Sequence, residues 1–222
     1  MLRISIFDMD RTITRSGTYS LWLKHWVRAR APWRAAMLPL VGIVGMGFLA
    51  GAYDRGRLKA ANQTMLMGKR VDAGIVEREA AVFAQDILAR HCHADALRRL
   101  QSERAEGRRV MIATASFDYY VHALSRLFRA EDVIATRCER DAGDILARLN
   151  GPNCYGEDKL AQIESYFEAR GIDRSECHVR FFTDHHSDLP TLEWSDEAIT
   201  VNPDKKLKAA AQEKGWPVLH WS

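Results

Sequence analysis

Cysteine is scarce in this chain of 222 residues, and its four cysteines are widely spaced, so that no two form a CxxC pair. Structural zinc sites and thioredoxin-like redox motifs usually need that pairing, so we expect neither. His91, Cys92 and His93 are three adjacent potential metal ligands. They lie where a helix is expected to end, and adjacent residues there point to different faces, so we do not interpret them as a metal site.

The chain also lacks a strong charge of either sign, and we expect no leader segment. It has 32 basic and 29 acidic residues, a net charge of +3, which gives no reason to expect a nucleic-acid partner. The apolar start, residues 1–7, is too short for a signal peptide and is followed at once by acidic residues. We therefore expect a cytoplasmic protein.

The overall composition is that of an ordinary globular protein, with 47% hydrophobic and 27% charged residues. This composition excludes the disordered and low-complexity classes. One stretch stands out from that average. Residues 35–53 are nineteen residues without a single charge. As one helix, at about 1.5 Å per residue, this stretch would nearly match the ~30 Å hydrocarbon core of a bilayer.

The order of expected elements predicts an α/β fold. Residues 2–7 form an apolar run typical of a buried strand, while residues 18–92 hold no convincing strand and are expected to be helical. From residue 94 onward, strands and helices alternate, which predicts a doubly wound, mostly parallel sheet with helices on both faces. The expected strands after residue 94 are 110–113, 133–137, 144–149, 179–182, 198–201 and one near 218. The expected helices are 18–30, 35–53, 54–67, 72–90, 94–106, 117–128, 157–170, 187–193 and 204–214.

Chemically active side chains follow the ends of several of these strands, the edge where ligands bind in such sheets. The residues are Asp8, Asp10, Thr114, Asp184 and Asp188, together with Lys159 in the first turn of an expected helix. Each alone has an ordinary explanation, such as a helix cap or a surface charge. Together, four carboxylates at one edge would repel one another without a cation, and oxygen ligands with open positions suit Mg²⁺.

This set resembles the haloacid dehalogenase-like phosphatase superfamily. Residues 8–12, Asp-Met-Asp-Arg-Thr, match its DxDxT motif, and Thr114, Lys159 and the pair Asp184 and Asp188 match the three later motifs in order. The long helical insertion after the first motif is similar to the cap of the phosphoserine-phosphatase-like branch, subfamily IB. The resemblance implies a catalytic core of residues 1–16 and 93–222 and an all-helical cap of residues 17–92.

The resemblance also implies roles for the motif residues. Asp8 would attack phosphorus and form an aspartyl-phosphate, and Asp10 would protonate the leaving oxygen and then activate water. Mg²⁺ would be held by Asp8, Asp184 and the backbone carbonyl of Asp10. Asp188 and Thr12 would support the metal site, Asp188 by orienting the ligands or holding the lysine. The phosphoryl group would be bound by Thr114, Ala115 and Lys159.

Three positions depart from the family pattern. Arg11 replaces a common Gly or Ser and points either to solvent or toward the cap. His185 replaces a small residue, and we interpret His185 and His186 as exposed loop histidines. Gly17 stands where phosphoserine phosphatases carry a glutamate that reads the substrate amine, so dedicated phosphoserine hydrolysis is not expected.

The uncharged stretch leaves two possibilities for the class of substrate. A single membrane crossing between Asp8 and Asp184 would split the site, so residues 35–53 belong to the cap. We favour a buried helix or hairpin there, and hence a phosphatase for a small phosphorylated metabolite. The alternative is a membrane-surface phosphatase of lipid phosphates, phosphatidylglycerophosphatase-like, in which the stretch lies on the inner face of the membrane and flanking arginines meet anionic headgroups. The intact motifs argue against a third hypothesis, a catalytically silent phospho-ligand binding module.

Overall fold

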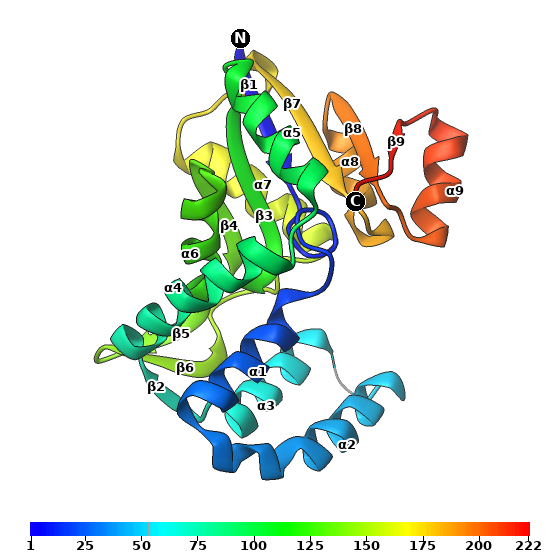
Figure 1. The fold of residues 1–222 in the computed structure, drawn as a ribbon. Helices are drawn as coiled ribbons and strands as arrows, with labels where there is room; N and C mark the ends of the chain where they lie inside the picture. Colours follow the sequence, from blue (N-terminus) through cyan, green and yellow to red (C-terminus); the bar gives the residue numbers. More distant parts are fainter. Residues whose placement is uncertain (53) are drawn as a thin grey trace.

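The computed structural model describes residues 1–52 and 54–222. Its main sheet has six strands, all parallel, in the order β4-β3-β1-β7-β8-β9 (Figure 1). This arrangement confirms the predicted α/β fold. The strands are β1 (Leu2–Phe7), β3 (Arg109–Phe117), β4 (Asp132–Thr136), β7 (Cys177–Thr183), β8 (Glu197–Val201) and β9 (Val218–Leu219).

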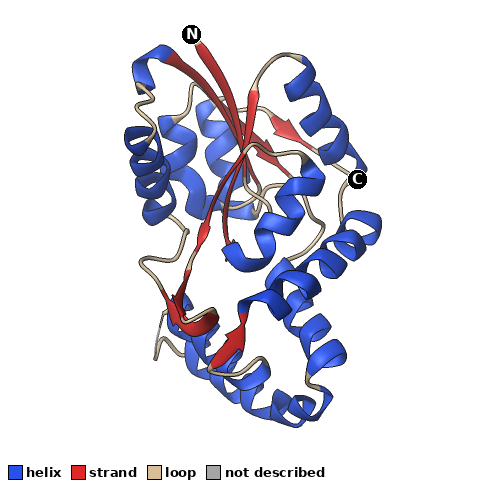
Figure 2. Cartoon of the chain, turned by 90° about the vertical axis from the view of Figure 1, so that its left-hand side faces the viewer, coloured by secondary structure: helices blue, strands red, loops and turns tan. Residues whose placement is uncertain are grey.

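Helices cover both faces of this sheet (Figure 2). The reason is visible in β3, where the side chains alternate: Val110 and Ile112 belong to one buried apolar cluster, and Met111 and Ala113 belong to the other. A strand that is apolar on both sides must be covered on both sides. The covering helices are α5 (Ala94–Ala105), α6 (Asp118–Phe128), α7 (Glu157–Ala169), α8 (Leu189–Trp194) and α9 (Lys205–Lys214), with 3₁₀ turns η2 (Arg174–Glu176) and η3 (His186–Asp188).

A second, antiparallel sheet lies beyond the carboxyl ends of the main strands, in the order β2-β6-β5. Its strands are β2 (Arg70–Asp72), β5 (Cys138–Asp141) and β6 (Asp144–Leu149). The expectations of an all-helical cap and of no strand within residues 18–92 are therefore wrong. β2 has only three residues, too few for a period-two pattern, and it owes its strand conformation to pairing with β6 far along the chain.

The cap helices agree with the predicted ranges, apart from the uncharged stretch. They are α1 (Thr18–Arg30), η1 (Pro32–Met37), α2 (Leu38–Leu49), α3 (Arg55–Leu66) and α4 (Ala73–Arg90). The stretch is not one helix, since it begins in a 3₁₀ turn and α2 ends at Leu49. Our preferred interpretation, a buried helix or hairpin, is also wrong, because neither η1 nor α2 contains a buried residue. α2 is apolar all round, so packing against α3 and η1 covers only part of its surface.

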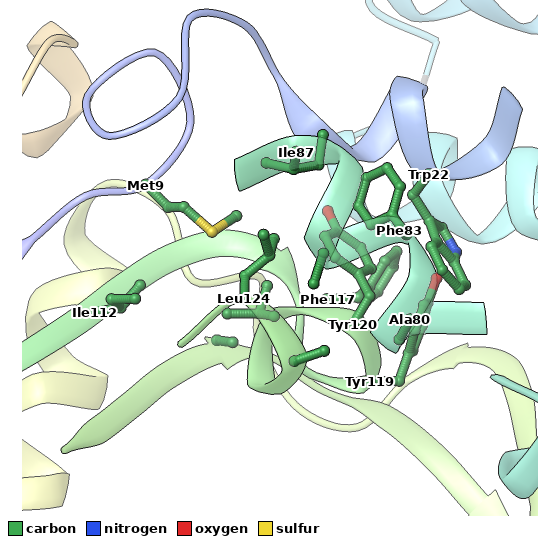
Figure 3. Close-up of a cluster of buried hydrophobic side chains, with 14 of the residues drawn as sticks. Met9, Trp22, Ala80, Phe83, Ile87, Ile112, Phe117, Tyr119, Tyr120 and Leu124 are labelled. Atoms are coloured by element: carbon green, nitrogen blue, oxygen red, sulfur yellow. The ribbon is translucent and has the colours of Figure 1, made fainter. Parts of the chain in front are cut away.

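An aromatic cluster joins cap and core (Figure 3). Trp22 of α1 stacks on Tyr120 of α6 at 5.3 Å between ring centroids, and its edge meets Phe83 of α4 at 5.3 Å. All three rings are almost fully buried. α4 packs along α6, so the region predicted as cap shares one hydrophobic core with the catalytic part. This packing holds α1 and α3 over the carboxyl edge of the main sheet.

Candidate active site

A cavity of about 340 Å³ lies at the carboxyl edge of the main sheet, between the strand ends and the cap. Asp8 follows β1, Asp184 follows β7, and Ala115 and Ser116 belong to the last part of β3, where the pairing with β4 is irregular. Lys159 reaches the same cavity from the first turn of α7. Parallel strands with this topology bring to one edge the residues that the sequence separates by up to 180 positions.

Lys159 is buried between two carboxylates. Its Nζ lies 2.9 Å from Oδ1 of Asp8 and 2.7 Å from Oδ2 of Asp188. The hydroxyl of Thr183 also donates to Oδ2 of Asp188, at 2.7 Å. Burial alone would lower the pKa of Lys159, but Asp188 and Asp8 outweigh it and raise that pKa above its ordinary value. The two carboxylates thus favour the charged form of the lysine beside the proposed nucleophile.

The same group has more carboxylates than its one lysine can balance. Burial raises the pKa of Asp8 above its ordinary value, against the attraction of Lys159, and the charges of Asp188 and Asp184 raise it further. Burial and Asp188 likewise raise the pKa of Asp184 to about 7, although a hydrogen bond from Thr12 opposes this. Among the described residues, Oδ1 of Asp188 is buried without a hydrogen-bond partner. This excess of buried carboxylate oxygens is the donor set that suits a hard divalent cation.

Asp10 lies in different surroundings from Asp8. Its Oδ1 accepts a hydrogen bond from the backbone N–H of Thr18, and its Oδ2 accepts one from the hydroxyl of Ser116, both at 2.6 Å. Thr18 is the first residue of cap helix α1, and Ser116 belongs to the core strand β3. Two carboxylates placed in such different environments can take different chemical roles.

Six of the eight site residues that we inferred from the sequence line the cavity. They are Asp8, Asp10, Ala115, Lys159, Asp184 and Asp188. The other two are fully buried and are not among the lining residues. The hydroxyl of Thr12 lies 3.4 Å from Asp8 Oδ2 and 3.2 Å from Asp184 Oδ1, so it connects these two carboxylates. The Thr114 hydroxyl accepts a hydrogen bond from the backbone N–H of Ser116 at 3.1 Å.

The three departures from the family pattern all lie at this cavity. Arg11 lines it with a φ of +66°, a left-handed conformation that favours glycine, which explains why a small residue is common there. Gly17 also lines it and offers no acidic group. The interpretation of His185 and His186 as exposed is wrong, because both are half-buried. His185 pairs with the hydroxyl of Ser187 at 2.9 Å, and Nδ1 of His186 lies 2.7 Å from Oδ2 of Asp204.

Sequence reasoning missed several cavity residues, of which Lys59 on α3 is the most informative. Its Nζ lies 2.5 Å from both the carbonyl oxygen of Ala115 and Oδ1 of Asn153. Burial lowers the pKa of Lys59 to about 8, against the attraction of Asp10. Nearby, the Arg55 guanidinium lies 4.4 Å from the centre of the Tyr155 ring. No spacing in the sequence connects α3 with the loop around residues 153–155, so only the folded chain brings them together.

Comparison with known proteins agrees with this geometry. The family model for haloacid dehalogenase-like hydrolases matches residues 6–193. A histidinol-phosphatase of Neisseria meningitidis is 22% identical over 242 residues, covering all of both chains. A crystal structure of a protein of unknown function from Bordetella pertussis has a TM-score of 0.87 and 21% identity, over 99% of this chain and 98% of that one. A substrate-bound phosphoserine phosphatase has a TM-score of 0.65 and 15% identity, over 99% and 93%.

The chain belongs to the haloacid dehalogenase-like hydrolases, and its fold is similar to that of the phosphoserine phosphatase.

Proposed function

We propose that this protein is a Mg²⁺-dependent phosphomonoesterase that works through an aspartyl-phosphate on Asp8. The observation that carries the proposal is the buried lysine between Asp8 and Asp188, beside Asp184, at the floor of one cavity. Phosphoryl transfer depends mainly on positioning and on neutralising the charge of the phosphoryl oxygens. A fixed cation beside a nucleophilic carboxylate is the minimal arrangement for that chemistry.

In this mechanism an oxygen of Asp8 attacks phosphorus, and the bond from phosphorus to the leaving oxygen breaks. Lys159 holds Asp8 in place and faces the phosphoryl oxygens. Asp10, fixed by Thr18 and Ser116, gives a proton to the leaving oxygen and later takes one from the water that hydrolyses the aspartyl-phosphate. Asp8, Asp184 and the carbonyl oxygen of Asp10 would hold Mg²⁺, which supplies further charge neutralisation when bound.

The lining of the cavity limits the substrate. Its acidic residues are the four aspartates of the family motifs, whereas Arg11, Arg55 and Lys59 add positive charge. Gly17 has no side chain that could accept a hydrogen bond from a substrate amine. We infer a small phosphorylated metabolite whose leaving group is neutral or anionic. The four cysteines are all free and buried, which supports a reducing compartment, and we place the enzyme in the cytoplasm.

A second candidate substrate is a lipid phosphate. The exposed apolar surface of α2 favours it, because Phe48 near the end of α2 lies 5.9 Å from the guanidinium of Arg55, which lines the cavity. A bilayer that covered α2 would therefore lie near the cavity.

The test is phosphate release from a panel of water-soluble and lipid phosphomonoesters, with and without Mg²⁺. We expect turnover by the wild-type protein, none after EDTA, and none by Asp8→Asn, whose amide is no nucleophile for phosphorus. The matched control is Asp188→Asn, which makes the same chemical change but leaves the nucleophile Asp8 in place. This variant should retain residual turnover. Turnover by Asp8→Asn at the wild-type rate would exclude the aspartyl-phosphate mechanism.

A further inference from the structure

The cap exposes an unusual amount of apolar surface in one place. Ten large apolar side chains are exposed among the described residues, and seven of them lie between Trp33 and Leu49. The most exposed within this segment is Leu49, at 83%. The whole stretch Pro32–Leu49 has the length and the mean hydropathy, 1.4, of a membrane-spanning helix, and none of it is buried. A contiguous patch of this kind on a soluble chain marks an interaction surface. The seven residues are Trp33, Met37, Leu38, Leu40, Ile43, Met46 and Leu49.

Positive charge surrounds this apolar segment. Residues 17–70 contain nine lysines and arginines and a single acidic residue, Asp54, so they carry a formal charge of +8 in a chain whose total is +3. The remainder of the chain must therefore be negative, at −5. Seven of the nine basic residues are exposed, namely Lys24, Arg28, Arg30, Arg55, Arg57, Lys69 and Arg70. A partner that fits the segment must therefore combine an apolar interior with a negatively charged surface.

The path of the chain indicates how the segment would lie on such a partner. α1 enters the segment and α3 leaves it, and α3 packs against both α1 and η1 (Figure 1). Both ends of the segment thus return to the same cap, which suits a helix lying along a surface and not one that crosses to the other side. Apolar side chains that enter the boundary between headgroups and acyl chains, and basic residues that face anionic headgroups, both favour binding to the surface of an anionic bilayer.

We propose that η1 and α2 form a docking surface for anionic membranes, with α2 lying in the headgroup region and the surrounding arginines and lysines facing acidic lipids. The proposal does not depend on the phosphatase activity, although docking would bring the cavity close to the bilayer through Phe48 and Arg55. Each exposed apolar side chain that enters the interface loses water contact, and each basic residue near an anionic surface adds electrostatic attraction.

The test is flotation of the purified full chain with vesicles of phosphatidylcholine alone and of phosphatidylcholine mixed with phosphatidylglycerol. We expect binding to the mixed vesicles, weaker binding to the neutral ones, and a decrease with added salt. Ile43→Glu should weaken binding at least tenfold. Its matched control is Val82→Glu on α4, since Val82 is exposed to 60% and Ile43 to 58%, and the control should bind as the wild type does.

The charge contribution has its own pair of variants. Arg57→Glu on α3 should weaken binding to the mixed vesicles by about fivefold or more, because one basic residue near an anionic surface contributes that much. Arg90→Glu on α4 is the control, because both side chains are exposed, 79% and 74%, and each pairs with an aspartate within its helix or at its cap. Circular dichroism of all four variants confirms that they fold.

Three results would overturn the proposal: no flotation with anionic vesicles, equal loss in Val82→Glu and Ile43→Glu, or a dimer in light scattering that Ile43→Glu dissociates and that does not float. Hydrolysis of a water-soluble phosphomonoester, measured without vesicles, should be the same in Ile43→Glu and the wild type. If that hydrolysis is absent while flotation succeeds, the proposed function fails and the docking surface stands.

Discussion

The ammonium group of Lys59, on cap helix α3, lies 2.5 Å from the carbonyl oxygen of Ala115, in the core segment expected to bind phosphate. The same ammonium contacts Oδ1 of Asn153, which also accepts a hydrogen bond from Thr136. One cap side chain thus joins the end of strand β3 to the loop around Asn153 at the cavity. Any movement of the cap away from the core must break these charge-assisted hydrogen bonds, so Lys59 links the position of the cap to the state of the site.

We predict that Lys59 sets the alkaline limit of activity. Burial lowers its pKa to about 8, so the group is charged below that pH and neutral above it. A phosphomonoester is already a dianion in this range, so its charge does not change. The kcat/KM of the wild type should fall by about tenfold as pH rises through 8, since a hydrogen bond from a charged donor is lost.

The matched variant is Lys59→Arg, which keeps a positive charge at all accessible pH values. Its normalised profile of kcat/KM should stay flat to higher pH than that of the wild type, and Lys59→Met should be low and flat. If the three normalised profiles coincide, another group is responsible for the alkaline limit.

A second prediction concerns the buried charges around Lys159. Among the described residues, Lys159 is the only cation that contacts Asp8 and Asp188, and Lys159→Met removes it while both carboxylates stay buried. We expect the free energy of unfolding in urea to fall by roughly 3–5 kcal/mol, the usual cost of leaving a buried charge unpaired. The double variant Lys159→Met with Asp188→Asn should regain part of this loss. Equal destabilisation of the single and double variants would show that packing, and not charge, explains the effect.

Residues at the strand ends could be predicted from the sequence, whereas the contacts made by the cap could not. Asp8, Lys159, Asp184 and Asp188 could be placed because a parallel sheet brings the ends of its strands to one edge, whatever the loops between them do. β2 could not be predicted, since three residues carry no pattern and the pairing with β6 comes from elsewhere in the chain. The role of Lys59 could not be predicted either, since its partners Ala115 and Asn153 come from distant parts of the chain.

The exposure of α2 was missed because composition and burial are different properties. An uncharged stretch between two basic helices was expected to be buried, as most apolar helices of soluble proteins are. Burial requires a neighbour, however, and α3 and η1 cover only part of α2. The sequence identifies the stretch as unusual, but it does not show whether the other cap elements cover all of its surface.

A third prediction separates metal binding from catalysis. Mg²⁺ that binds only the folded protein must stabilise it, by about 2.7 kcal/mol at a concentration a hundred times its Kd. The melting temperature of the wild type should therefore rise with Mg²⁺. Asp184→Asn should lose this response, because it removes a charged ligand while keeping an acceptor for Thr12. Asp173→Asn, at an exposed helix cap, should respond as the wild type does. A full Mg²⁺ response in Asp184→Asn would remove Asp184 from the ligand set.

The last prediction uses the backbone at Arg11. Its φ of +66° is unfavourable for any residue with a Cβ atom, and glycine avoids most of that cost. Arg11→Gly should therefore raise the free energy of unfolding by about 0.5–1 kcal/mol, measured in urea. The same change at Arg137, which is exposed and has no positive φ, should lower it. Because Arg11 also lines the cavity, Arg11→Gly should raise KM for anionic substrates while it stabilises the fold. A variant that is less stable than the wild type would show that the arginine side chain contributes contacts worth more than the backbone cost.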